Sequence, residues 1–184
     1  DKKYYIYSHS FIPQRRMQEH MDKEDNAPYI IWQKEGLLTV TTAAGGIKTD
    51  YKTILAHLHN IIDKYDIDLT AIGYDPHNAS AFLLDLEDFG CDLVEIKQSA
   101  RSLNDATIDF QLEVKAHNVE YDKKNKLLTR SMNDAILSEP NSFGEIKIDK
   151  MLQKVRIDPC DAIIDAHKLA MGAEVEEITT DQSI

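Results

Sequence analysis

The sequence has few cysteines and no long apolar run, and each scarcity excludes a class of protein. Among its 184 residues the two cysteines, Cys91 and Cys160, have no paired spacing, so neither a disulfide framework nor a cysteine-based zinc site is expected. No apolar stretch approaches the roughly 20 residues that span a bilayer, and the first ten residues contain no apolar core of a signal peptide. These features favour a soluble, intracellular, single-domain protein that has no membrane partner.

Positive charge is also scarce. The chain carries 21 lysines and arginines against 32 aspartates and glutamates, which gives a formal net charge of −11. Domains that bind nucleic acids by themselves are usually basic overall. The composition therefore argues against an independent nucleic-acid-binding module, but it permits a catalytic domain that depends on neighbouring domains to bind DNA.

Several catalytic signatures are missing as well. The glycine pair in "GGIKT" (45–49) lacks the spacing of a phosphate-binding loop, so the chain is not expected to hydrolyse ATP by itself. Serine and histidine residues do not form a recognisable catalytic triad. His57 and His59 stand two residues apart on a predicted helix and cannot share a face, so we expect surface positions for both.

Apolar periodicity predicts strands that alternate with helices. The predicted strands cover residues 2–13, 37–46, 69–76 and 91–99, and a hairpin or extended loop covers 142–151. The predicted helices cover residues 50–66, 79–90 and 104–117, a segment that ends near 137, and a last helix that begins near 158. This order indicates an α/β domain, and the tyrosine-rich first strand suggests an antiparallel edge on a mixed sheet.

The first candidate site residue is Asp75, which follows a predicted strand in "AIGYDPHNA" (71–79). Pro76 ends the strand and leaves the carboxylate at the rim of the sheet, where ligand sites of open α/β sheets lie. The alternative is a turn in which the aspartate side chain accepts a hydrogen bond from its own backbone.

The second candidate is the acidic start of the last helix, "RIDPCDAIIDA" (156–166). Asp158 and Pro159 fit the N-cap and first helical positions, and Asp161 then falls at the third, as in a capping box. Capping does not explain Asp165, which lies one turn further in. We expect the helix to pack on the sheet by an alanine-rich face, which would bring its aspartates close to a strand-end carboxylate.

Carboxylates gathered in this way repel one another unless a cation joins them. Mg²⁺ and Mn²⁺ prefer oxygen ligands, and two such ions about 4 Å apart can activate water and stabilise a leaving oxygen. This is the chemistry of phosphodiester cleavage. Helix capping and metal binding both stay open as explanations of the acidic helix.

Basic residues accompany both candidates. Lys97 and Arg101 follow the strand after the first candidate, and Lys150, Lys154 and Arg156 lead into the acidic helix. Each can contact DNA phosphates, or it can belong to a solvated charged face. Further basic residues in such clusters are Lys123, Lys124, Lys126, Arg130 and Lys147.

Together, "AIGYDPHNA" and "KVRIDPCDAIIDA" (154–166) resemble the nuclease domain of a tailed-bacteriophage terminase large subunit. The likeness extends through "WQKEGLLTVT" (32–41), "VEIKQSARSLNDA" (94–106) and "IKIDKMLQKVRIDP" (146–159). The resemblance therefore covers almost the whole chain.

This resemblance implies an RNase H-like α/β fold, which is a mixed β-sheet flanked by α-helices. It also implies a metal-dependent endonuclease that cuts concatemeric double-stranded viral DNA by two-metal hydrolysis, with Mg²⁺ or Mn²⁺ as the two ions. By correspondence with the family, Asp75 and Asp161 are catalytic metal ligands and Asp158 is an adjacent ligand or cap, while Asp165 at most supports them.

The resemblance further implies a set of partners. These are double-stranded DNA, the portal protein and the small terminase subunit of a packaging motor, with an ATPase domain upstream in the full-length polypeptide. The implied location is the cytoplasm of the infected or lysogenic bacterial host.

One feature departs from the family pattern. The resembling domains begin with a central strand that carries the first metal-binding aspartate, whereas residues 1–10 here look like the strand after it. We therefore expect residues 1–172 to form the nuclease domain without that strand, and residues 173–184 to form an acidic tail. If the strand is truly absent, its loss should expose two sheet edges and leave cleavage weak or undetectable.

Two other functions stay open. Another RNase H-like nuclease, such as a junction resolvase, would prefer branched DNA to linear duplex. A non-catalytic docking module would bind the portal protein or the small terminase subunit through its acidic surface, and it would keep this partner without binding metal.

Overall fold

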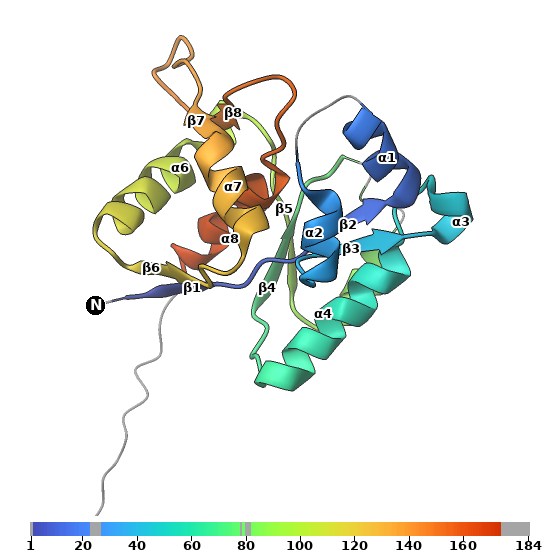
Figure 1. Ribbon diagram of the computed structural model, residues 1–184. Helices are drawn as coiled ribbons and strands as arrows, with labels where there is room; N and C mark the ends of the chain where they lie inside the picture. The colour runs from blue at the N-terminus through green and yellow to red at the C-terminus, as the bar shows by residue number, and fades with distance from the viewer. Residues whose placement is uncertain (1, 23–26, 78, 80–81, 174–184) are drawn as a thin grey trace, which may run out of the picture.

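The computed structural model describes residues 2–22, 27–77, 79 and 82–173, and it has short strand pairs covered by helices (Figure 1). Its strands are β1 (Tyr4–Ile6), β2 (Ser10–Pro13), β3 (Leu38–Thr41), β4 (Ala71–Tyr74), β5 (Asp92–Glu95), β6 (Val119–Tyr121), β7 (Ala135–Leu137) and β8 (Ile148–Lys150). Its helices are α1 (Gln14–Asp22), α2 (Tyr29–Lys34), α3 (Ala43–Gly46), α4 (Tyr51–Tyr65), α5 (Leu83–Glu87), α6 (Ala100–Lys115), α7 (Lys126–Asp134) and α8 (Asp158–Ala170). Within these ranges, no helix is long and apolar enough to cross a bilayer.

Within the described ranges, the strands form four separate pairs. Parallel pairs join β1 to β6, β2 to β3 and β4 to β5, while β7 and β8 form an antiparallel hairpin. The antiparallel edge expected from the tyrosine-rich start is therefore wrong, because β1 and β2 pair in parallel with strands that come later. Parallel neighbours need a crossover connection, which α1 and α2 supply between β2 and β3. Of the segment 142–151, which was expected to form a hairpin or an extended loop, residues 148–150 form one strand of this hairpin. The other strand, β7, lies in a stretch that was predicted to be helical, so the helix prediction is wrong at residues 135–137.

Local capping explains where several helices begin and end. The Asp50 side chain accepts a hydrogen bond from the Thr53 backbone N–H at 3.2 Å, so Asp50 is the N-cap and α4 starts one residue after the beginning of the helix predicted at 50–66. The Ser99 hydroxyl accepts from the Ser102 N–H at 3.2 Å, so α6 starts four residues earlier than predicted. Of the helix predicted at 79–90, the described part forms the shorter α5. The predicted tail lies outside the described residues from 174 onward.

Two apolar clusters make the core. The larger one surrounds α8 and includes Ile96 from the end of β5, Leu103 and Phe110 from α6, and Ile163 and Ile164 from α8. The smaller one surrounds Trp32 and contains Met17, Tyr29, Leu38 and Leu127. The helices α6, α7 and α8 all contribute to the larger cluster. Figure 1 shows these three helices grouped together, apart from α1 and α2 beside β2 and β3.

The expectation that α8 packs by an alanine face is wrong. The helix buries Cys160, Ile163, Ile164 and His167, while the alanines at 162 and 166 are exposed. Large apolar side chains remove more surface from water than alanine, so they decide which face turns inward.

Close approach of α8 to the sheet depends instead on Gly73 in β4. A β-carbon built at Gly73 would lie 3.1 Å from Leu169 Cδ1 and 3.3 Å from Ile96 Cγ1. These separations are shorter than ordinary carbon–carbon contact. The missing side chain of Gly73 therefore lets the acidic helix cross directly over the strand that precedes Asp75.

Substituting Gly73 should separate the helix from the strand in a graded way. We expect Gly73→Ala to cost little because the end of the Leu169 side chain can shift. Gly73→Val should lower the free energy of unfolding by roughly 1–3 kcal/mol, as overpacked cores do. Urea denaturation of the three proteins measures this, and equal stability of the valine variant would contradict the close approach.

A stacked histidine pair joins the start of β2 to α4. The rings of His9 and His57 have centroids 4.2 Å apart, and the His9 Nε2 lies 2.8 Å from the Thr39 hydroxyl. The Tyr7 hydroxyl lies 3.3 Å from the His57 Nε2. His57 is half-buried rather than a surface residue, whereas His59 is exposed as predicted.

Acidification should weaken this contact. Burial, reinforced by the neighbouring His57, lowers the pKa of His9 to about 4, and burial also lowers the pKa of His57. Because the folded chain favours neutral His9, its contribution to stability is complete above pH 6.5 and is lost as the pH falls toward about 4. Melting temperatures should therefore drop less between pH 7 and 4.5 in His9→Gln than in the wild type, and parallel curves would contradict this assignment.

Candidate functional site

Five aspartates among the described residues line one cleft of about 1100 Å³ between β4 and α8; one of them, Asp92, lies at the start of β5, and the other four come from the two acidic segments of the sequence. We call it the carboxylate cleft. Asp75 enters it from the end of β4, and Asp158, Asp161 and Asp165 enter it from α8. The helical residues are spaced by three and four positions, which places them on one side of α8. The structure thus brings together the strand-end and helix carboxylates that the sequence singles out.

Asp75 lies in the turn that the sequence offered as the alternative to a functional role. Its Oδ1 accepts a hydrogen bond from the His77 N–H at 2.9 Å, and the residue is exposed. The carboxylate still faces the cleft, and its charge contributes to raising the pKa of Asp165. The turn is therefore confirmed, while metal ligation by Asp75 stays a prediction.

Asp158 does not cap α8 in the predicted way. Ile157 occupies the N-cap position, no side chain makes a capping hydrogen bond, and Asp158 is already the first helical residue. The capping box expected from Asp158 and Asp161 is therefore wrong, because the helix begins one residue earlier than that capping box requires. Both carboxylates lie in the first turn, where the helix dipole favours negative charge, and neither is used as a cap.

The carboxylate of Asp161 is the most perturbed acid in the cleft. Burial, the charge of Asp158 and smaller contributions from Asp165 and Asp149 raise its pKa to about 6, while Lys147 acts in the opposite direction. Burial is also the main cause of the raised pKa of Asp165. Carboxyls in this state release their proton readily when a cation enters the cleft.

Gln98, which the sequence did not single out, completes the cleft together with Lys147, which the sequence offered only as one of several basic residues near the acidic helix. The Gln98 Nε2 donates to both carboxylate oxygens of Asp165 at 3.0 Å, and the Lys147 Nζ donates to the Gln98 backbone oxygen at 3.2 Å. Gln98 follows β5 much as Asp75 follows β4, and the carboxyl ends of this parallel pair meet at one edge. That rule could have found Gln98, since strand-end polar residues gather there.

The cleft is not a preformed metal cage. Within the described part of the chain, no three Asp, Glu, His or Cys side chains are positioned to hold one metal ion together. Coulomb coupling between carboxylates acts over several ångströms, whereas ligation needs oxygens about 2 Å from the ion. The raised pKa of Asp161 is therefore compatible with carboxylates that face one cleft without converging on a point.

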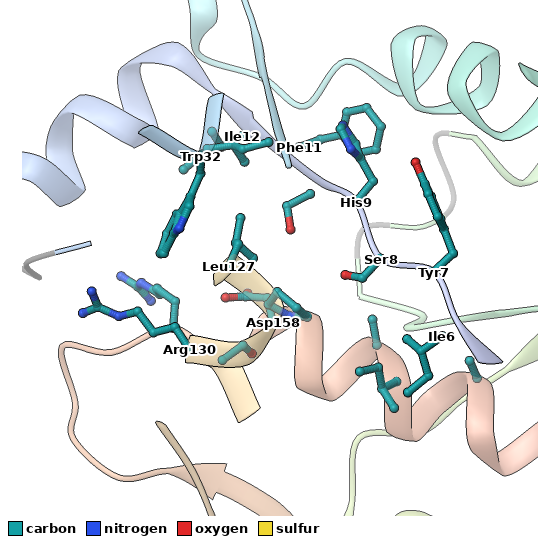
Figure 2. Close-up of a pocket in the computed structure, with 18 of the residues that line it drawn as sticks. Ile6, Tyr7, Ser8, His9, Phe11, Ile12, Trp32, Leu127, Arg130 and Asp158 are labelled. Atoms are coloured by element: carbon teal, nitrogen blue, oxygen red, sulfur yellow. The ribbon is translucent and has the colours of Figure 1, made fainter. Parts of the chain in front are cut away.

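The basic residues predicted to contact DNA fall into three places. Lys97 and Arg101 are exposed between β5 and the first turn of α6, and Lys150 lies in β8. Lys154 and Arg156 line a second cavity of about 740 Å³ on the other side of the first turns of α8. Figure 2 shows this cavity, with Asp158 beside it.

Strand-end and helix carboxylates share one cleft in an α/β fold, which is the arrangement that the resemblance to RNase H-like nucleases led us to expect. Residues 1–174 match the family model described as the endonuclease domain of the terminase large subunit. The chain belongs to this family, and its fold is RNase H-like, as the resemblance implied.

A particular relative comes from Enterobacteria phage HK97. The chain is 27% identical to the large subunit of the HK97 terminase over 176 residues, which is 95% of this chain and 32% of that protein. The crystal structure of the HK97 large terminase matches with a TM-score of 0.72 and 28% identity, covering 86% of this chain and 32% of that one. The chain thus spans about a third of the length of this relative.

Proposed function

We propose that this domain is a divalent-metal-dependent endonuclease that cuts concatemeric double-stranded viral DNA during genome packaging. The observation that carries the proposal is the carboxylate cleft, where burial and neighbouring aspartates raise the pKa of Asp161 to about 6. Negative charge held together in this way is unfavourable until a cation balances it. Membership of the terminase endonuclease family supports DNA as the substrate.

The donor chemistry of the cleft fits Mg²⁺ or Mn²⁺. Both ions prefer carboxylate oxygens, and Mg²⁺ is commonly held by one or two carboxylates, with water and substrate phosphates completing its shell. A three-ligand cage within the described residues is therefore not required. We assign Asp75 and Asp161 as ligands of two ions, with Asp158 as a supporting ligand. Bound ions would supply the Lewis acidity that activates water and offsets charge on the phosphate.

Other side chains of the cleft orient the carboxylates and the substrate. The Gln98 side-chain amide donates hydrogen bonds to both carboxylate oxygens of Asp165. These bonds hold Asp165 beside the proposed metal ligands. The Lys147 ammonium, fixed on the Gln98 carbonyl, faces the same cleft. We assign it to a non-bridging oxygen of the scissile phosphate. Lys97, Arg101, Lys150, Lys154 and Arg156 would contact flanking phosphates.

The proposed setting is the packaging motor. The partners we propose are the portal protein, the small terminase subunit and an ATPase domain in the longer polypeptide, acting in the cytoplasm of the bacterial host. These assignments rest on the family and on the HK97 relative, of which this chain covers about a third.

Plasmid cleavage tests the proposed activity. Supercoiled plasmid incubated with the chain should be nicked with Mg²⁺ or Mn²⁺ and left intact with EDTA. Linear duplex and a four-way junction of the same sequence should be cut at similar rates. A strong preference for the junction would favour a resolvase, and failure to nick with either metal would remove the assignment of cleavage to this chain.

One observation favours a second candidate function. Because no three ligating side chains converge within the described residues, the domain could serve as a docking module for the portal protein or the small terminase subunit. A docking module would bind its partner equally well in the presence and absence of metal. A nuclease would respond to metal whether or not the partner is present.

A further inference from the structure

The carboxylate cleft contains aromatic side chains that the proposed metal chemistry does not use. Phe82, which immediately precedes α5, lines the cleft, and so does Tyr74 at the end of β4. Both side chains are partly buried rather than enclosed in the core. Phe82 therefore shares one space with Asp75, the strand-end aspartate that we assign as a metal ligand.

The Phe82 ring is held in place before any ligand arrives. The Phe82 and Tyr51 rings have centroids 4.5 Å apart, and their planes are inclined by only 9°. Tyr51 is the first residue of α4, which the Asp50 side chain caps. The Phe82 N–H donates to the Ala79 carbonyl at 3.1 Å, and the Phe82 carbonyl accepts from the Leu86 N–H at 3.1 Å. A ring fixed in this way loses little side-chain entropy when a ligand stacks on it.

A second stack near α5 provides a comparison. The Phe89 and His59 rings have centroids 4.2 Å apart, and their planes are inclined by 12°. Neither of these residues lines the carboxylate cleft. The two stacks thus make the same kind of contact between α4 and the region of α5. Phe82 differs from Phe89 because it also forms part of the wall of the cleft.

The part of DNA that suits an aromatic ring is the nucleobase. Aspartates repel a phosphate unless cations balance them, whereas a nucleobase is neutral and has a flat face that stacks on aromatic rings. Each such stack contributes about 5- to 100-fold in affinity, with little dependence on sequence. Inside a duplex both faces of a base are covered by its neighbours. Only a base that has left its stack can therefore use the ring.

We propose that Phe82 is a stacking platform for one unstacked nucleobase beside the scissile phosphate. The inference rests on the proposed nuclease function and adds to it the state of the DNA that the cleft accepts. Leaving the stack costs least at a mismatch or in a single strand, so cleavage should be favoured next to an unpaired base. A fully paired four-way junction keeps its bases stacked within the arms, and it gains nothing from this platform.

Binding of single strands tests the platform without cleavage. A labelled thymidine strand of about ten nucleotides and the same strand without bases are titrated in EDTA at low salt, with fluorescence anisotropy as the readout. The wild type should bind the thymidine strand about 5- to 100-fold more tightly than the abasic one. Phe82→Leu should lose this difference, and Phe82→Trp, which restores an aromatic face, should recover it. Phe89→Leu is the matched control and should keep the difference.

Cleavage next to a mismatch tests the position of the platform. Two duplexes that differ by one mismatched thymine are incubated with the chain and Mn²⁺. The wild type should nick the mismatched duplex several-fold faster than the matched one, and the ratio of the two rates should fall to about one in Phe82→Leu. Because both rates come from one preparation, the ratio is insensitive to a general loss of folded protein.

The outcomes separate this inference from the proposed function. Equal affinity of the wild type for the two strands, a wild-type nicking ratio of about one, or equal changes in Phe82→Leu and Phe89→Leu would overturn the platform while leaving metal-dependent plasmid nicking untouched. Binding that requires both bases and Phe82, in a chain that nicks no DNA, would keep the base site and overturn cleavage. A wild-type chain that neither binds the thymidine strand nor nicks DNA would overturn both.

Discussion

Replacing Asp161 with asparagine is expected to lower metal-dependent nicking by about 100-fold or more, because losing a charged metal ligand removes several kcal/mol of charge stabilisation. The same change should make the metal-free chain more stable. The pKa of Asp161 rises from 3.8 to about 6 on folding, so its ionised form disfavours the fold as the pH rises from 3.8 through 6. At neutral pH the asparagine variant should gain roughly 1 kcal/mol, after allowance for the partial exposure of the group.

This opposite change in activity and stability distinguishes loss of function from misfolding. Urea denaturation in EDTA and plasmid nicking in Mn²⁺ measure the two quantities on the same preparations. Asp63→Asn is the control, because Asp63 is exposed on α4, does not line the cleft and does not contribute to the pKa of Asp161. Nicking by Asp161→Asn at the wild-type rate would remove Asp161 from the ligand set, and a less stable metal-free variant would contradict its electrostatic assignment.

Replacing Lys147 with methionine should lower nicking at saturating metal by about 10- to 100-fold, since a hydrogen bond to a charged group contributes about 1.5–3 kcal/mol. The Lys147 Nζ is fixed on the Gln98 carbonyl and its charge lowers the pKa of Asp161. Methionine keeps the length of the stem and removes the charge. Metal affinity should not fall, because the lost charge repels a cation.

Comparison with Lys150→Met makes this prediction specific. Lys150 lies three residues further along, in β8, and does not line the cleft. Its loss should leave cleavage at saturating metal and DNA within a few-fold of the wild type. Equal losses in the two variants would mean that general positive charge, rather than an ammonium in the cleft, explains the effect.

The candidate carboxylates could be predicted from the sequence because residues close to them in the chain indicate where strands end and helices begin. Asp75 precedes a proline that ends a strand, and Asp161 and Asp165 stand one turn apart on a helix whose start Pro159 also marks. These signals depend only on near neighbours in the chain. The α/β class and the position of α4 followed in the same way from apolar spacing.

The remaining features depend on residues far apart in the sequence. Gln98 meets Asp165 across 67 positions, and Gly73 matters only because Leu169 packs over it. The pairing of β1 with β6 and the exposure of the α8 alanines depend on which apolar side chains are buried in the core. Local periodicity carries no information on that competition, since it does not say which partner each strand or helix face meets.

The most direct test of the metal site is the effect of Mn²⁺ on stability. The wild-type chain and an Asp75→Ala, Asp161→Ala double variant are unfolded by heat with increasing Mn²⁺, beside EDTA controls. A ligand that binds only the folded chain raises the melting temperature with concentration. We expect a saturating rise in the wild type that disappears in the double variant. Equal curves for the two proteins, with or without a rise, would contradict a metal site built from these aspartates.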